Sequence, residues 1–194
     1  KYEALFRSPK VMVTSGRFAP QKNQAPLLDV FAELLKTQPD AKLVFLGDGD
    51  LRDKLVAQAQ SLGLRLYQAW NNDPLDRDYD LYFLGFQKNP FKYIRRSSWF
   101  VFPSEWEGFP MALSEAMICG TPVITTDCPT GPREILAPTT PPEQQATATE
   151  WAEYGVLMPL LDANFRQGAL QEWAKTLDLL LNDQARHAHY RQQG

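Results

Sequence analysis

Cysteine and histidine are scarce in this sequence. Cys119 and Cys128 are the only cysteines among 194 residues, and the two histidines, His187 and His189, both lie near the C-terminus. Two thiols in a chain of this length fit a reducing compartment better than a disulfide-linked scaffold. The histidines are more typical of a terminal helix than of a ligand set. We therefore expect no metal site and no cofactor.

The sequence also lacks long apolar runs and an excess of charge of one sign. No apolar stretch approaches the ~18 residues that cross a bilayer, and the first seven residues lack the apolar core of a signal peptide. A formal net charge of −3, with no long basic run, does not indicate a nucleic-acid partner. Hydrophobic residues make up 44% and charged residues 22% of the chain, as in soluble globular proteins. A cytoplasmic protein with one sizeable domain is expected.

Apolar runs alternate with segments of helical spacing along most of the chain. Strands are predicted at 11–14, 42–46, 79–84, 99–102, 122–125 and 155–158. Helices are predicted at 27–35, 51–62, 91–95, from 108 onward, at 131–136 and at 170–181. The segment 64–78 is less regular, and 138–149, with three prolines, is the clearest loop. This alternation predicts an α/β fold with a doubly wound parallel sheet.

Glycine or serine follows four of the predicted strands. These residues are Gly16, Gly47, Gly85 and Ser104. Ligands of doubly wound sheets bind outside the carboxyl ends of the strands. We therefore expect these four positions to share one edge of the sheet, where a ligand binds.

Two carboxylates flank a predicted helix start in the segment 103–124. Gly108, Phe109 and Pro110 open the helix, because proline suits the first helical turn, and Gly120 supplies a left-handed stop. Unpaired N–H groups and the helix dipole attract phosphate there. Glu107 and Glu115 would repel phosphate, but an ionised carboxylate can accept both hydrogens of a vicinal diol. Together they could hold a sugar-diphosphate-ribose, although two isolated glutamates are more often surface residues.

Two cations follow the first predicted strand. Gly16 lets the chain turn close to a ligand, and Arg17 and Lys22 come next. A guanidinium can hold phosphate oxygens at two places, and an ammonium supplies a mobile point charge. Either cation alone would more often be a solvated surface residue.

Both segments resemble the signature motifs of family 4 retaining glycosyltransferases (glycosyl transferases group 1). The E-x7-E signature is matched at Glu107, Gly108, Phe109, Glu115, Ala116, Met117, Gly120, Pro122, Val123 and Ile124, and a G-R-x-x-x-x-K motif at Gly16, Arg17 and Lys22. The resemblance extends to 47–49, 83–86 and 127–135. It implies that 1–194 is the C-terminal, donor-binding domain of a GT-B enzyme with a Rossmann-like sheet. Residues 1–10 would then be the tail of an interdomain linker, 183–194 a terminal helix or tail, and the N-terminal acceptor domain would be absent.

The resemblance also implies roles for individual residues. Arg17 and Lys22 would hold the donor diphosphate and Glu107 the sugar hydroxyls, which makes these three the expected catalytic residues. Glu115 would hold the ribose diol. Backbone groups at Gly85 and Phe86 would face the nucleobase. The remaining substrate-binding positions are expected to be Gly16, Gly108, Phe109, Met111 and Ala112.

The implied activity is transfer of a hexosyl or N-acetylhexosaminyl group, with retention, from a nucleotide-diphosphate sugar. UDP is the favoured nucleotide. The acceptor would be a glycan or glycolipid of bacterial cell-surface polysaccharide or lipopolysaccharide synthesis, bound through the missing domain, so the isolated chain is expected to be inactive. Peripheral membrane association of the full-length protein, at the inner face of the membrane, stays open.

Three alternatives remain at this point. One is a GT-B epimerase of a UDP-amino sugar, and another is a non-catalytic nucleotide-sugar binding module. A nicotinamide enzyme ranks third, because no Gly-x-Gly-x-x-Gly follows the first strand.

Overall fold

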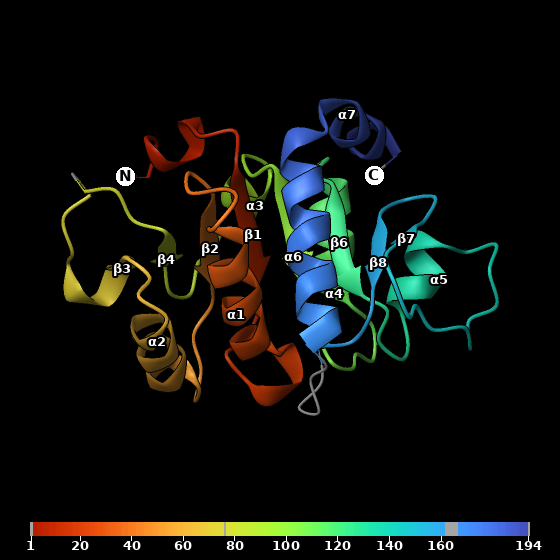
Figure 1. The fold of residues 1–194 in the computed structure, drawn as a ribbon, viewed down its shortest axis with the longest axis horizontal. Coiled ribbons are helices and arrows are strands. Elements are labelled where there is room, and N and C mark those ends of the chain that lie inside the picture. The colour runs from red at the N-terminus through yellow and green to blue at the C-terminus, as the bar shows by residue number, and fades with distance from the viewer. Residues whose placement is uncertain (1, 76, 162–166, 194) are drawn as a thin grey trace.

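A single mixed sheet forms the centre of the molecule (Figure 1). The computed structural model describes residues 2–75, 77–161 and 167–193, and eight strands occur within them. They are β1 Val11–Ser15, β2 Lys42–Leu46, β3 Leu66–Gln68, β4 Leu81–Phe83, β5 Trp99–Phe102, β6 Val123–Thr126, β7 Glu150–Trp151 and β8 Val156–Met158. Their spatial order is β3-β4-β2-β1-β5-β6-β8-β7, with every pair parallel except β7 and β8.

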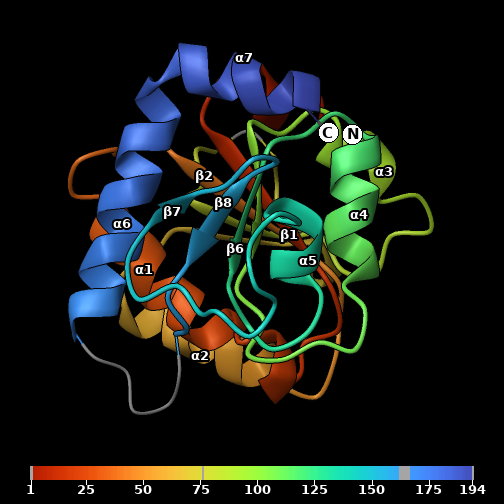
Figure 2. The same cartoon turned by 90° about the vertical axis from the view of Figure 1, so that its right-hand side faces the viewer.

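Helices cover both faces of this sheet, as Figure 2 shows. The helices are α1 Gln24–Leu34, α2 Arg52–Ser61, α3 Phe91–Ile94, α4 Met111–Ile118, α5 Pro132–Leu136, α6 Gln167–Asn182 and α7 Gln184–Gln193. Short 3₁₀ helices lie at η1 Leu5–Arg7, η2 Pro20–Lys22 and η3 Ala69–Asn71. Helices α1, α2 and α6 pack on one face, and α3, α4 and α5 on the other. The predicted doubly wound α/β fold is therefore confirmed.

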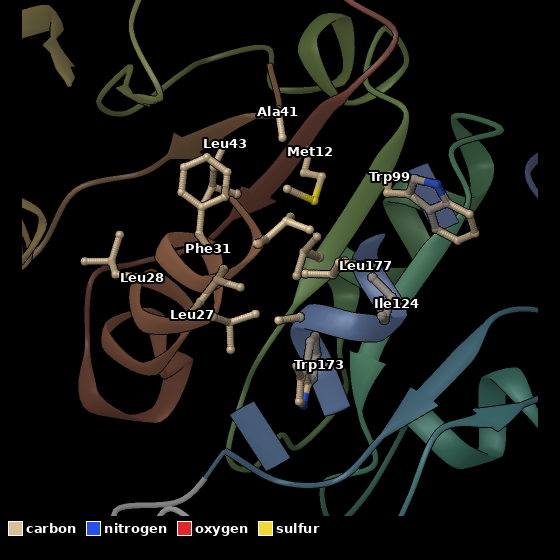
Figure 3. Packing of buried hydrophobic residues seen from close by; sticks show 14 of the residues in the cluster. Met12, Leu27, Leu28, Phe31, Ala41, Leu43, Trp99, Ile124, Trp173 and Leu177 are labelled. Atoms are coloured by element: carbon tan, nitrogen blue, oxygen red, sulfur yellow. The ribbon is translucent and has the colours of Figure 1, made fainter. Parts of the chain in front are cut away.

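Alternate residues of each central strand enter different halves of the core. In β1, Met12 packs with α1 and α6, whereas Val11 and Val13 pack with the helices of the opposite face. Figure 3 shows Phe31 of α1 and Trp173 of α6 in the first of these clusters. Because both faces are covered, the strands are continuous apolar runs, which is typical of parallel sheets.

The strand order reverses between β1 and β5. From β1 the chain builds the sheet outward through β2 and β4, and from β5 it builds outward in the other direction through β6 and β8. The loops that follow the two central strands therefore lead to helices on opposite faces, α1 and α4, and they start at the carboxyl ends of the strands, where ligands of such sheets bind. Residues 16–22 follow β1 and residues 103–110 follow β5, so the fold places them side by side at this reversal point.

Two short edge strands differ from the sequence-based expectation. The segment 64–78 contains β3, which pairs with β4, and β7 follows the loop 138–149 as an antiparallel edge strand. Each has only two or three residues. Such strands are formed by pairing with a neighbour, and they are too short to show an apolar repeat of their own.

The helix boundaries also differ in one place. Helix α4 begins at Met111 and Pro110 is its N-cap, with φ −80° and ψ 71°, so the predicted opening at Gly108–Pro110 was wrong. Its predicted stop is confirmed: Gly120 has a φ of +67°, and the Thr121 N–H donates to Ala116 O at 3.0 Å. The predicted terminal helix is α7, while Gly194 lies outside the described residues. Within the described ranges, no helix has the length and apolar content needed to cross a bilayer.

A buried ion-pair network ties α5 to β7 and to Asp127, which directly follows β6. The Arg133 guanidinium donates to Asp127, to Glu150 at 2.8 and 3.0 Å, and to the Thr140 hydroxyl at 2.9 Å. The side chains of Arg133 and Asp127 are only 3% and 2% exposed. Asp127 also accepts the Ala146 N–H at 2.6 Å. One guanidinium therefore anchors the long 138–149 loop to the sheet.

Replacing Arg133 with methionine should destabilise the fold by about 3–5 kcal/mol, because it leaves the Asp127 carboxylate buried without a cation. Urea denaturation followed by circular dichroism measures this loss. The matched control is Arg77→Met, which removes an exposed guanidinium and should change the free energy of unfolding by about 0.5 kcal/mol or less. Equal effects of the two substitutions would contradict a structural role for the network.

Acid should weaken the same network. Hydrogen bonding to Arg133 lowers the pKa of Glu150 below its ordinary value of 4.5. Because the folded-state pKa is the lower one, this contribution to stability is complete above about pH 4.5 and is lost as the pH falls through the folded-state pKa.

Candidate functional site

A hollow of about 360 Å³ lies at the carboxyl ends of β1, β2 and β4. It is lined by Ser15, Gly16, Arg17, Leu46, Gly47, Asp48, Phe86, Gln87 and Pro90. We call it the carboxyl-end hollow. It brings together three loops that are distant in the sequence. Gly16 and Gly47 lie on the same edge as predicted, with Phe86 beside them.

Backbone hydrogen bonds join these three loops directly. The Gly16 N–H donates to Leu46 O, and the Gly47 N–H donates to Gly85 O, both at 3.0 Å. A Cβ added to Gly47 would lie 2.0 Å from Gly16 O, and the φ of Gly47 is +153°. Gly49 is also crowded, since a Cβ there would lie 2.5 Å from Phe18 O. Glycine at these positions lets the loops approach closely enough to form one edge.

Lys22 and Glu107 form an ion pair between the loops that follow β1 and β5. Lys22 Nζ lies 2.6 Å from Glu107 Oε1, and the two side chains are 21% and 5% exposed. The Lys22 ammonium also lies 5.2 Å from the centre of the Phe102 ring, a cation–π contact. The Lys22 stem runs past Gly16, where an added Cβ would lie 3.6 Å from its Cδ and Cε. Gly16, Lys22 and Glu107 thus form one contiguous group.

Polar residues that the sequence did not single out hold this group in place. Gln21 O accepts the Glu105 N–H, and Gln21 Nε2 donates to Trp106 O, both at 2.9 Å. The Thr130 hydroxyl donates to Glu107 O. Gln24 is buried, and its Nε2 donates to Arg17 O at 2.9 Å. These amide and hydroxyl bonds depend on which loops approach one another, so no local pattern indicates them.

Arg17 occupies a different environment from Lys22. It lines the carboxyl-end hollow, and its guanidinium pairs with Asp50 at 2.9 Å. Both side chains are largely exposed, at 69% and 83%. Exposed pairs of this kind contribute only about 0–1 kcal/mol. The Arg17 guanidinium can therefore exchange Asp50 for another anion at little cost.

The start of α4 is more exposed and more fully hydrogen-bonded than the sequence suggests. Phe109 and Met111 are 62% and 60% exposed, and Gly108 is exposed as well. Three of the first four N–H groups of the helix are already accepted: that of Met111 by Phe109 O, and those of Leu113 and Ser114 by Pro110 O. Ala112 carries the fourth. Fewer free amides therefore face an anion than the helix start alone implies.

Glu115 lies half-buried on α4, apart from the Lys22–Glu107 pair. Within the described residues, no hydrogen bond or ion pair joins Glu115 to either of them. Burial, followed by the charge of Glu115, raises the pKa of the neighbouring Cys119 thiol. The structure thus unites Gly16, Lys22 and Glu107, and leaves Glu115 as a separate acceptor.

The two thiols and the nearby aspartates do not form a metal centre in the described part of the chain. No cluster of three or more His, Cys, Asp or Glu residues there is arranged for a metal ion. Cys128 is a buried free thiol. Burial and the charge of Glu107 raise its pKa to about 11, so Cys128 is neutral at neutral pH.

Comparison with known proteins connects this geometry to a family. Residues 9–153 match the model of the family described as glycosyl transferases group 1. An uncharacterized glycosyltransferase of Methanocaldococcus jannaschii is 40% identical over 157 residues, which are 81% of this chain and 36% of the relative. The N-acetylgalactosamine-N,N'-diacetylbacillosaminyl-diphospho-undecaprenol 4-alpha-N-acetylgalactosaminyltransferase of Campylobacter jejuni is 35% identical over 127 residues, which are 66% of this chain and 30% of that protein. The chain spans about a third of the length of these relatives.

The fold is similar to that of a larger solved protein. The structure of TarM from S. aureus in complex with UDP superposes with a TM-score of 0.73 at 20% identity, over 94% of this chain and 30% of that one. At this level of identity the likeness concerns the fold.

Replacing Gly47 with alanine should destabilise the protein by about 1–3 kcal/mol, because the new methyl group collides with Gly16 O. Gly168→Ala is the control, since nothing lies within 4 Å of a Cβ at that helical position. Thermal unfolding of both variants measures the difference. An unchanged melting temperature for Gly47→Ala would refute the close approach of these loops.

Proposed function

Because the chain belongs to the glycosyl transferases group 1 family, we propose that it is the C-terminal, donor-binding domain of a retaining GT-B glycosyltransferase. The observation that carries the proposal is the Lys22–Glu107 pair, which lies where the strand order reverses, together with the carboxyl-end hollow next to it. Ligands of doubly wound sheets bind at this reversal.

The donor is proposed to lie along the carboxyl edge of the sheet. The carboxyl-end hollow, about 360 Å³, would take the nucleobase against Gly85 and Phe86, since small-ligand sites measure about 300–1,000 Å³. Arg17 and Lys22 would hold the diphosphate, and Glu115 the ribose diol. UDP is the favoured nucleotide, and the UDP complex of TarM supports this choice.

The Lys22–Glu107 pair suggests how donor binding and catalysis are linked. A diphosphate that reaches Lys22 would replace Glu107 as the partner of the ammonium group. The released Glu107 carboxylate would then accept hydrogen bonds from sugar hydroxyls. When the bond between the anomeric carbon and the diphosphate oxygen breaks, its electron pair moves to that oxygen. Lys22 and Arg17 would stabilise this growing charge more strongly than they stabilise the ground state.

The acceptor would bind mainly to a second domain. The chain spans about a third of the length of its relatives, so catalytic contacts from the rest of the protein are expected. One relative is named for transfer to a diphospho-undecaprenol-linked acceptor. We therefore favour a glycan or glycolipid acceptor in cell-surface polysaccharide or lipopolysaccharide synthesis, with the protein in the cytoplasm or at the inner face of the membrane.

Substitution of Lys22 tests the catalytic part of the proposal. In the full-length enzyme, Lys22→Ala should lower turnover about 10²-fold or more, because it removes a preorganised cation from the leaving group. Arg17→Ala should act in the same direction. Lys54→Ala, an exposed lysine on α2, is the matched control. Turnover is measured by release of the nucleoside diphosphate, and the melting temperature of each variant verifies that it is folded. If Lys22→Ala turns over at a near-normal rate, Lys22 has no role in the reaction.

Nucleotide binding tests the role of Glu115. Glu115→Ala should weaken UDP binding to the 194-residue chain by about 10–100-fold, the usual effect of losing hydrogen bonds to a charged group. The control is Glu143→Ala in an exposed loop. Calorimetry that gives the same affinity for Glu115→Ala and wild type would rule out the ribose contact.

A thermal-shift panel of UDP-, GDP-, ADP- and TDP-sugars identifies the donor, because ligand stabilisation grows with the logarithm of concentration over Kd. If none of these sugar nucleotides stabilises the protein at millimolar concentration, the donor-binding role is contradicted. Product analysis with and without acceptor separates transfer from epimerisation.

A further inference from the structure

A second and larger hollow lies at the opposite edge of the sheet. It measures about 630 Å³, and its walls come from residues 6–10, 95–99 and 180–184, with His187 and Arg191 of α7. Residues 9–10 and 97–98 directly precede β1 and β5, so this hollow lies at the amino ends of the central strands. Figure 1 shows α7 and the N-terminal segment along this edge. We call it the amino-end hollow.

Positive charge is concentrated in the amino-end hollow. Its lining includes five basic residues: Arg7, Lys10, Arg95, Arg96 and Arg191. Asp183 is the acidic residue of the lining, and it is already bound to Arg186 through both the side chain and the backbone N–H. This cluster stands in a chain whose net charge is −3. Positive charges that lie together in a concave site repel one another and attract anions.

The protein neutralises only part of this cluster. Lys10 pairs with Asp40 at 2.9 Å, and Arg96 donates to both carboxylate oxygens of Glu3 at 2.9 and 2.8 Å. The guanidinium groups of the other three, Arg7, Arg95 and Arg191, are exposed and form no ion pair within the described ranges.

Apolar side chains line the hollow beside these guanidiniums. Phe6, Leu181 and the buried Trp99 belong to its walls. Low-dielectric walls of this kind focus the electric field of the charges that line a cleft. Planar guanidiniums bind phosphate oxygens in a bidentate manner, which surface lysines cannot do.

We propose that the amino-end hollow is a second anion site, which binds a phosphate-bearing molecule through Arg7, Arg95 and Arg191. The ligand chemistry is that of an oligophosphate or of a phospholipid headgroup. Arg7 belongs to the N-terminal segment, Arg95 is the C-cap of α3, and Arg191 belongs to α7, so a bound phosphate joins both ends of the described chain to the sheet. This site is separate from the donor site at the carboxyl edge.

Tripolyphosphate binding to the 194-residue chain, measured by calorimetry, tests the proposal. The double variant Arg7→Glu/Arg95→Glu should raise the Kd by about tenfold or more, since it removes two charged hydrogen-bond donors. The matched control Lys54→Glu/Lys175→Glu makes the same change of net charge at exposed positions outside the hollow and should change Kd less than threefold. Equal weakening in both double variants overturns the proposal, because the effect would then come from net charge alone.

The tripolyphosphate measurement is repeated in the Arg17→Ala/Lys22→Ala background, so that binding at the proposed donor site does not contribute. Tripolyphosphate binding that disappears in this background overturns the second site, whereas binding that persists and still depends on Arg7 and Arg95 supports it. The proposed donor function is judged separately, by UDP binding. Should the double variant prove unfolded by circular dichroism, Arg191→Gln alone provides the same comparison.

Vesicle flotation distinguishes the two sources of phosphate. The wild-type chain is mixed with phosphatidylglycerol–phosphatidylcholine vesicles or with phosphatidylcholine vesicles alone. Flotation with the anionic vesicles that is lost in Arg7→Glu/Arg95→Glu assigns the site to a lipid headgroup. Binding of tripolyphosphate without flotation assigns it to a free phosphate compound. If the wild-type chain neither binds tripolyphosphate nor floats with the anionic vesicles, the proposal is refuted.

Discussion

The loops after β1 and β5 lead to α1 and α4 on opposite faces of the sheet, because the strand order reverses between these two strands. Lys22 comes from the first loop and Glu107 from the second, and they meet at 2.6 Å. Glu107 is nearly buried, and the Lys22 ammonium lies against its carboxylate. The topology therefore brings two charged groups together at the place where we propose that the phosphate and hydroxyl groups of the donor bind.

The two edges of the sheet differ in how charge is arranged. At the carboxyl edge, each of the two cations is matched by an acid: Lys22 by Glu107 and Arg17 by Asp50. At the amino edge, Arg7, Arg95 and Arg191 have no such partner within the described residues. A balanced site suits a ligand that brings both phosphate and hydroxyl groups, while an unbalanced one suits a simple polyanion. The small net charge of the chain does not indicate this difference between the two edges.

Most of the fold could be predicted from local patterns. The apolar runs at β1, β2, β5 and β6 indicate buried strands, and the spacing in α1 and α6 indicates helices packed on the sheet. The edge strands β3 and β7 could not be predicted, because pairing with β4 and β8 defines them. The start of α4 was misplaced for a related reason: Gly131 leaves no room for a Cβ beside Pro110, so contact with a distant loop positions the helix entry.

By itself, the sequence determined the α/β class and the edge of the sheet at which Gly16, Gly47 and Gly85 lie, because alternating strands and helices force parallel pairing. It also identified the motif residues, Lys22 and Glu107 among them. Only the tertiary structure decided which charges meet: Lys22 with Glu107, Arg17 with Asp50, and Arg133 with Asp127. These partners are separated by as many as 85 residues along the chain. The spacing of apolar, glycine and proline residues along the sequence indicates burial and turns. The contacts between charged residues depend instead on the spatial order of the strands in the sheet.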